Sequence, residues 1–142
     1  MSSVFELDPR LAADTFQLGN LGLCELCLMN DATYPWFILV PRVPNATELV
    51  DLDEQQQHRL WHESNQLSRF LQQDWSMDKL NIAVLGNVVK QLHIHHVVRH
   101  TGDPAWPKPV WGHASPVAYT DTQRMAITQR VEQKLLANIS RG

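Results

Sequence analysis

The sequence predicts an α+β fold built on an antiparallel β-sheet. Apolar stretches of strand length follow one another with hairpin-length connections, a long amphipathic helix interrupts them, and a capped helix is expected near the C-terminus. Strands and helices in this order favour an α+β arrangement. No repeat or linker divides the 142 residues, so we expect one domain over 1–142, with its core at about 8–112 and a helical tail at about 119–139.

The first elements are expected before residue 42. Asp8-Pro9 is a suitable helix start, which predicts a helix over 8–16 that ends before the break at Gly19-Asn20. Two strands follow at about 21–30 and 35–41. The Asn, Asp and Pro residues between these strands are typical of a hairpin turn.

A long helix is expected from Asp51 or Asp53 to about Asp74. Its apolar stripe recurs at helical spacing and consists of Leu60, Ser64, Leu67 and Leu71. A third strand is predicted at 80–85 and a fourth at 88–98, with a turn between them. Thr120 or Asp121 caps a final helix, whose apolar side is expected to carry Met125, Val131 and Leu135.

Composition excludes several classes of function. The chain is 44% hydrophobic and 19% charged, as in soluble globular proteins, and no apolar run approaches the roughly 20 residues that a membrane span needs. The formal net charge is −3 and no basic run appears, which argues against nucleic-acid binding. The N-terminus lacks the features of a secretory signal, so we expect a cytoplasmic protein without a membrane partner.

Two possible metal or redox patterns are better explained structurally. Cys24 and Cys27 form a Cys-x-x-Cys pattern, but residues three apart on a strand point to opposite faces, so we expect reduced cysteines. His58 and His62 lie four apart on the long helix without the glutamate of a metalloprotease motif. A surface pair is therefore the expected interpretation.

The most informative segment is Gln91-Leu92-His93-Ile94-His95-His96-Val97. On a strand, alternate side chains share a face, so Gln91, His93 and His95 are expected in one row about 7 Å apart. His96 belongs with the opposite, core-facing row. Imidazole can act as nucleophile, proton donor or metal ligand near neutral pH. Spacing alone leaves phosphate chemistry, metal ligation and a purely structural role open.

This segment resembles the His-φ-His-φ-His-φ-φ motif of the histidine triad (HIT) superfamily, where φ is apolar. The preceding Gly86-Asn87-Val88-Val89-Lys90 matches the glycine-led approach to that motif, and the hairpin from Asn30 to Arg42 resembles the family's nucleoside-binding hairpin. The resemblance covers about residues 20–100. The tail with Trp106 and Trp111 resembles a small bacterial branch that is similar to diadenosine polyphosphate hydrolases.

The resemblance implies a HIT-like sheet and cleavage of a nucleoside phosphoanhydride or phosphoramidate. His93 would attack the α-phosphate to form a nucleotidyl-histidine, His95 would bond the scissile phosphate, and Gln91 would take the place of the first histidine. The remaining assignments concern binding. Asn30 or Asp31 would contact ribose hydroxyls, Asn81 and Asn87 would position the phosphates and His93, and backbone N–H groups near Val88 would contribute.

The resemblance further implies a homodimer, because the family usually pairs through its sheets, and no metal or other cofactor. The chain departs from the family's pattern at four points. Gln91 replaces a histidine, His96 replaces an apolar residue, Val88 lacks a hydroxyl, and a shorter hairpin loop lets Trp36 reshape the nucleoside pocket.

Two other functions stay open at this point. A nucleotide-binding sensor or scavenger would keep the pocket and turn over negligibly. A zinc protein would use His93, His95, His100 or Cys24 as ligands.

Overall fold

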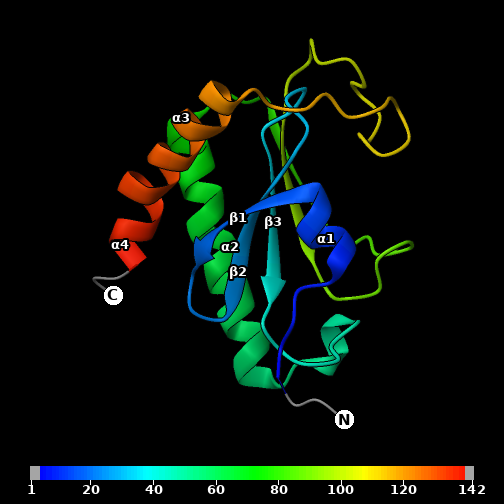
Figure 1. Cartoon of the computed structure of the whole chain (residues 1–142), viewed down its shortest axis with the longest axis vertical. Helices are drawn as coiled ribbons and strands as arrows, with labels where there is room; N and C mark the ends of the chain where they lie inside the picture. Colours follow the sequence, from blue (N-terminus) through cyan, green and yellow to red (C-terminus); the bar gives the residue numbers. More distant parts are fainter. Residues whose placement is uncertain (1–3, 140–142) are drawn as a thin grey trace.

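The computed structural model describes residues 4–139 as five strands and a set of helices (Figure 1). The elements are α1 (Pro9–Asp14), β1 (Thr15–Asn20), β2 (Cys24–Met29), β3 (Trp36–Pro41), η1 (Leu49–Asp51), α2 (Glu54–Asp74), β4 (Lys79–Ala83), β5 (Ile94–Arg99), α3 (Asp121–Val131), η2 (Glu132–Leu136) and α4 (Ala137–Ile139). The strands form one antiparallel sheet in the order β1-β2-β3-β5-β4. The predicted α+β class, with one long helix and a C-terminal helical region, is confirmed.

The sheet is covered on both faces. Along one face runs α2, which buries leucines such as Leu60, Leu67 and Leu71 against apolar side chains of β2, β3 and β5 (Figure 1). Against the other face lie Leu11 of α1, the N-terminal residues Phe5 and Leu7, and the loop after β5. Alternate residues of each central strand therefore enter two different cores, which explains why β3 and β5 are buried along their whole length.

Local sequence signals fix the position of α2. The Asp53 side chain accepts the N–H of Gln56, while the Gln56 side chain accepts the N–H of Asp53, forming a reciprocal cap. Near the middle of the helix the carboxylate of Glu63 is fully buried. It accepts the backbone N–H groups of Leu23 and Cys24, so it ties α2 to the turn between β1 and β2. The predicted helix and its stripe are confirmed.

Two predicted boundaries are wrong. The helix expected over 8–16 is a single short helix, α1, because the chain turns into β1 at Thr15 and pairs with β2. The pairing is irregular between Gln17 and Gly19, where a bulge breaks the alternation that would have revealed a strand. The fourth strand, expected over 88–98, begins only at Ile94, and residues 84–93 form an irregular loop.

The C-terminal helices pack against the edge of the sheet formed by β1. Thr120 caps α3 as expected, and Val131 and Leu135 are buried, whereas Met125 is 57% exposed and does not join the predicted apolar side. Arg130 and Lys134 pair with the carboxylate of Asp74 at the end of α2. Within residues 4–139, none of the helices combines the length and the apolar character that a membrane span requires.

Candidate active site

The three neighbouring histidines separate onto the two faces of the sheet, as strand parity predicts. His96 is fully buried on the α2 side, where its Nε2 accepts the Ser64 hydroxyl at 2.7 Å and its Nδ1–H faces the carbonyl of Ile94 at 3.2 Å. His93 and His95 lie together on the other side, with ring centroids 4.8 Å apart. The candidate site is therefore a pair of imidazoles, and the prediction that His96 faces the core is confirmed.

The orientation of His93 is set by the backbone before the strand. Its Nδ1 lies 2.6 Å from the carbonyl oxygen of Gln91, which can only accept, so Nδ1 carries the hydrogen. A neutral imidazole with its proton on Nδ1 has its lone pair on Nε2. Gly86 packs beside this ring, since a Cβ there would lie 3.6 Å from Cε1 of His93 and 2.7 Å from the carbonyl oxygen of Val89. A side chain at position 86 would push the loop away from His93.

His95 has the opposite arrangement of its ring proton. The indole Nε1–H of Trp36 donates to Nδ1 of His95 at 3.0 Å, and Nε2 of His95 lies 3.3 Å from the carbonyl oxygen of Leu85. The proton therefore sits on Nε2. Burial, reinforced by the neighbouring His93 ring, lowers the pKa of His95 to about 4, so this imidazole is neutral at physiological pH.

Two cavities flank the pair of imidazoles. The smaller, of about 370 Å³, is lined by His93 together with residues of the 84–93 loop and of the segment before η1; they are Thr47, Glu48, Val84, Gly86, Asn87, Lys90, Gln91 and Leu92. The larger, of about 790 Å³, is lined by Trp36 and Trp111, whose rings contact His95, and by Asn30 and Asp31. His93 thus lines the smaller cavity, and His95 lies behind two residues that line the larger one.

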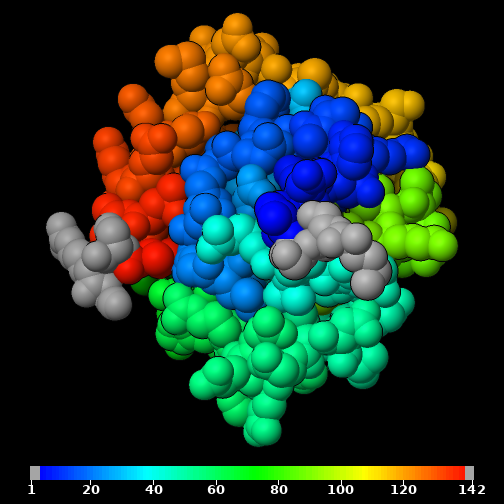
Figure 2. Space-filling view, turned by 60° about the horizontal axis from the view of Figure 1, so that its bottom comes forward, coloured from blue at the N-terminus to red at the C-terminus, as the bar shows by residue number. Residues whose placement is uncertain are grey.

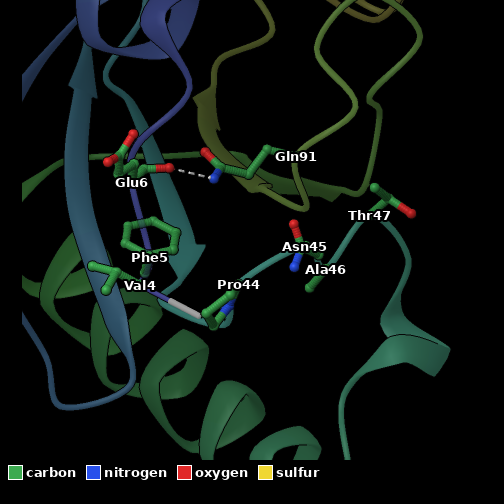
Figure 3. A pocket seen from close by; sticks show the side chains of 8 residues that line it. All are labelled: Val4, Phe5, Glu6, Pro44, Asn45, Ala46, Thr47 and Gln91. Atoms are coloured by element: carbon green, nitrogen blue, oxygen red, sulfur yellow. Dashed lines mark hydrogen bonds between the residues drawn. The ribbon is translucent and has the colours of Figure 1, made fainter. Parts of the chain in front are cut away.

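Gln91 serves the site through the backbone of the N-terminal segment. Its carboxamide N–H donates to the carbonyl of Glu6 at 2.8 Å (Figure 3). Its oxygen accepts the N–H of Asp8, also at 2.8 Å. With these two bonds the side-chain amide pairs with the backbone of residues 6 and 8 as a neighbouring β-strand would. Gln91 thus holds the N-terminal segment with its side chain and His93 with its own carbonyl oxygen. Because β5 begins at Ile94, both Gln91 and His93 precede it, and of the expected row of three side chains on one strand only His95 lies on the strand.

Three separate segments meet around Gln91. Space-filling representation shows the N-terminal residues beside the segment that precedes α2 and close to the loop before β5 (Figure 2). A cavity of about 360 Å³ lies between the first two of these segments, lined by Phe5, Pro44 and Gln91 among others (Figure 3). Thr47 and Gln91 line both this cavity and the one that contains His93.

Asn30 and Asp31 follow β2 and contact the segment before α3. Asn30 Oδ1 accepts the N–H of Tyr119 at 2.9 Å, and Asp31 Oδ1 accepts the N–H groups of Thr33 and Val117 at 3.0 and 3.2 Å. These bonds fold residues 113–119 over the larger cavity, which they help to line. The expected nucleoside residues therefore do lie at a cavity, and they also hold one of its walls.

The other expected binding residues, Asn87, Val88 and Asn81, lie in three different environments. Asn87 lines the cavity that contains His93, whereas Val88 is 70% exposed and is not among the lining residues. Asn81, on β4, accepts a hydrogen bond from the guanidinium of Arg99 at 2.8 Å. Arg99 is 1% exposed, makes a bidentate ion pair with Asp103 and donates to the carbonyl of Lys108. This network orders the loop that carries Trp111.

The residues considered as metal ligands do not converge. Cys24 lies in the core facing α2 and Cys27 in the core of the opposite face, and burial raises the pKa of the Cys27 thiol to about 12. His58 and His62 are exposed on α2, and the His100 ring lies 3.9 Å from Asp78. In the described part of the chain, no three His, Cys, Asp or Glu side chains are grouped as a metal site would require.

Sequence reasoning missed several residues around the pair. Trp36 was expected to shape the nucleoside pocket, but its hydrogen bond to His95 was not foreseen. Trp111 contacts the His95 ring from the loop after β5, and Thr47 and Lys90 line the cavity at His93. Lys90 lies next to the motif and could have been found from its position. The contacts of Trp36 and Trp111 depend on tertiary structure and left no local signal.

These features define an α+β protein with a pair of buried imidazoles on one face of an antiparallel sheet, between two cavities. The HIT domain model matches residues 10–102, and the chain belongs to the HIT domain family. Proteins of this family are generally nucleotide hydrolases or transferases and bind nucleotides.

Three solved structures support this assignment over almost the whole chain. A histidine triad protein from Marinobacter aquaeolei is 50% identical, with a TM-score of 0.92 over 96% of this chain and 98% of that one. One from Bradyrhizobium japonicum is 45% identical, with a TM-score of 0.91 over 93% and 98%. One from Sinorhizobium meliloti is 39% identical, with a TM-score of 0.89 over 92% and 97%. No curated protein matches the chain.

Proposed function

We propose that this protein cleaves a nucleoside phosphoanhydride or phosphoramidate, of the dinucleoside-polyphosphate type, through a nucleotidyl intermediate on His93. The observation that carries the proposal is the bond between His93 Nδ1 and the Gln91 carbonyl oxygen at 2.6 Å. It directs the lone pair of a neutral ring to Nε2, and His93 lines a cavity. A ring held in this way is suited to nucleophilic attack.

The reaction proceeds in two displacements at phosphorus. Nε2 of His93 forms a bond to the α-phosphorus, and the bond from phosphorus to the leaving oxygen or nitrogen breaks with its electron pair. Water then attacks the same phosphorus and loses a proton to solvent, while the bond from phosphorus to Nε2 breaks and its electron pair returns to His93. The products are the nucleoside monophosphate and the free imidazole. A positive charge develops on the His93 ring during the attack, and the Gln91 carbonyl oxygen stabilises it because a hydrogen bond from a charged donor is stronger.

His95 supplies a hydrogen-bond donor to the same phosphate. Its proton is on Nε2, since Nδ1 accepts from Trp36. In the structure this proton faces the carbonyl oxygen of Leu85 at 3.3 Å, a long contact that a phosphate oxygen could replace. A preorganised donor directed at an oxygen where charge accumulates lowers the barrier to the displacement.

The two cavities suggest how the substrate is oriented. The nucleoside would enter the larger cavity, between Trp36 and Trp111. Asp31 Oδ2 would meet the ribose hydroxyls there, because Oδ1 accepts from Thr33 and Val117. The leaving group would extend into the smaller cavity, toward Asn87 and Lys90.

Supporting residues complete this proposal. Asn30 would hold the wall of the nucleoside cavity, Asn81 would support the site through Arg99, and backbone N–H groups near Val88 would meet phosphate. Gln91 acts in place of the first histidine of the motif, through its backbone carbonyl and its bonds to residues 6 and 8. The mechanism proposed here uses no metal or cofactor.

We further propose that the protein is a cytoplasmic homodimer consisting of one domain per chain, and that it is similar to diadenosine polyphosphate hydrolases. The edge strand β4 supports pairing, since it lies at the end of the sheet and exposes Ile82 by 43%, with Val84 just after the strand exposed by 41%. An unpaired edge is a template for a second chain.

The test of the proposed function is release of nucleoside monophosphate from dinucleoside polyphosphates and from nucleoside phosphoramidates. We expect His93→Ala to lose at least three orders of magnitude in rate, because no other described side chain supplies a nucleophile at this position. His58→Ala, which removes an exposed histidine of α2, is the matched control and should turn over like the unmodified chain.

Comparable turnover in His93→Ala would contradict the proposal. Tight nucleotide binding by calorimetry, with no product from either protein, would instead show the alternative function, a catalytically weak nucleotide sensor or scavenger.

A further inference from the structure

Trp36 occupies an unusual position for a buried tryptophan at the start of β3. It is 7% exposed, and its indole N–H donates to Nδ1 of His95 at 3.0 Å. The indole and imidazole ring centroids are 5.8 Å apart with an interplanar angle of 60°. The register of the sheet explains the contact, because Ile38 pairs with His95 and Trp36 lies two residues earlier on the same face.

The indole is held firmly by two aromatic neighbours. Tyr34 packs edge-on against it at 6.4 Å and Trp111 at 5.6 Å between ring centroids. Trp111 also contacts the His95 ring directly, at 5.0 Å and 78°. Trp36 and Trp111 therefore contact the His95 ring from two segments, and Trp36 also donates a hydrogen bond to its Nδ1.

The chemistry of this bond has a definite consequence. An indole nitrogen is a donor and never an acceptor, so the His95 Nδ1 that it meets must hold a lone pair. The single proton of the neutral ring is then on Nε2, where the carbonyl oxygen of Leu85 can accept it. Protonating Nδ1 would set two N–H groups against each other, which opposes formation of the imidazolium.

Of the other groups that face His95, the Leu85 carbonyl oxygen favours a charged ring, whereas burial and the neighbouring His93 and His96 oppose it. The groups around the ring are His96 on its own strand, Trp36 on β3, His93 and the Leu85 carbonyl in the 84–93 loop, and Trp111 in the loop after β5. No carboxylate is among these neighbours in the described part of the chain. The indole hydrogen bond and the low polarity of the surroundings therefore act in the same direction.

We infer that Trp36 is a positioning residue that holds His95 in the neutral Nε2–H tautomer, so that its donor remains directed at the substrate phosphate. This inference deepens the proposed function and rests on it for its catalytic meaning. The hydrogen bond itself can be tested without any substrate. Trp36 acts through His95 and does not touch the reacting atoms.

The first test is nuclear magnetic resonance on the full chain labelled with ¹⁵N. We expect a scalar coupling across the hydrogen bond between Trp36 Nε1 and His95 Nδ1, and a non-protonated chemical shift at Nδ1 of His95. Trp36→Phe keeps an aromatic ring and removes the donor, so His95 should take up a proton at a higher pH than in the unmodified chain. Trp111→Phe is the matched control, because it alters the other indole beside His95, and there the coupling to Trp36 should persist.

The second test is kinetic. We expect Trp36→Phe to lower kcat about five- to tenfold, as the loss of one hydrogen bond between neutral groups allows, with KM within about twofold. A protonated Nδ1 at His95 in the unmodified chain, or absence of the coupling, would overturn the inference even if Trp36→Phe cannot be prepared in folded form. If the coupling is present but no nucleotide is turned over, the positioning contact stands and the proposed function fails.

Discussion

Each histidine of the motif has its ring proton fixed by a different neighbour. The Gln91 carbonyl holds the proton of His93 on Nδ1, an indole keeps it off Nδ1 of His95, and the Ile94 carbonyl holds it on Nδ1 of His96, where Nε2 then accepts from Ser64. Three chemically identical side chains within four residues thus acquire different capacities. His93 can offer a lone pair at Nε2, His95 can donate there, and His96 is fully engaged in the core.

The buried histidines predict a loss of stability in acid. Burial lowers the pKa of both His95 and His96 to about 4 in the folded chain, against 6.5 for an ordinary histidine. Between these values the unfolded chain binds more protons than the folded one, so stability is complete above about pH 6.5 and falls as the pH drops toward 4. Each histidine contributes a slope of up to about 1.4 kcal/mol per pH unit in this window.

Denaturant unfolding of His96→Gln between pH 4 and 7 measures this contribution. The slope of the unfolding free energy against pH should decrease by the amount that one buried histidine contributes. This holds whatever the variant's stability at pH 7. His58→Gln, an exposed position on α2, should keep the slope of the unmodified chain. An unchanged slope in His96→Gln would show that His96 is not held neutral.

At single residues, the sequence predicted which face of the sheet a side chain lies on better than it predicted which residues that side chain contacts. The parity of the motif correctly assigned His96 to the core and His93 with His95 to the other face. It could not predict that Gln91 would lie outside the strand, because the apolar residues of an irregular loop and of a strand look alike. The contact between Trp36 and His95, 59 residues apart, depends on strand register and is not encoded locally.

Among the elements, the loop after β5 depends on one buried ion pair. Arg99 and Asp103 have side chains exposed by only 1% and 7%, and the Arg99 guanidinium lowers the pKa of Asp103 to about 2. The aromatic rings of Tyr34 and Trp106 lie against the guanidinium, which also donates to Asn81 and to the carbonyl of Lys108. The pair therefore connects β4, β5 and the loop that brings Trp111 to His95.

Removing one partner of this pair should be costly. We expect Asp103→Ala to lower the free energy of unfolding by about 3 to 5 kcal/mol, because it leaves a buried guanidinium without its carboxylate. Asp14→Ala removes an exposed partner of Arg10, and a change within about 0.5 kcal/mol is expected there. Similar midpoints for the two variants in denaturant unfolding would contradict the role given to Asp103.

Elements with strong local signals were predictable. The cap at Asp53 and the stripe of α2 identified that helix almost to the residue, and Thr120 identified the start of α3. The strand β1 was missed because its pairing contains a bulge, and the end of α1 was misplaced with it. The Arg99–Asp103 pair could not be predicted, since a charged pair four residues apart in sequence is usually exposed.

For the whole molecule, the two edges of the sheet differ. The C-terminal helices approach β1, where Leu136 would lie 3.0 Å from a Cβ at Gly19, whereas Ile82 of β4 and Val84 just after it are exposed. If β4 pairs with a second copy, Ile82→Lys should shift the mass in sedimentation equilibrium from dimer toward monomer. Val50→Lys, at an 84% exposed position in η1, should leave the mass unchanged. A monomeric unmodified chain at micromolar concentration would refute the homodimer.

The central claim is that His93 forms a covalent bond to the nucleotide. The most direct measurement is rapid mixing with a dinucleoside polyphosphate, quenching in alkali to preserve a phosphoramidate, and peptide mass spectrometry. We predict a nucleoside monophosphate attached to the peptide that contains His93, with fragmentation assigning it to that residue and none in His93→Ala. Product release without an adduct on His93, or an adduct on another residue, would contradict the account.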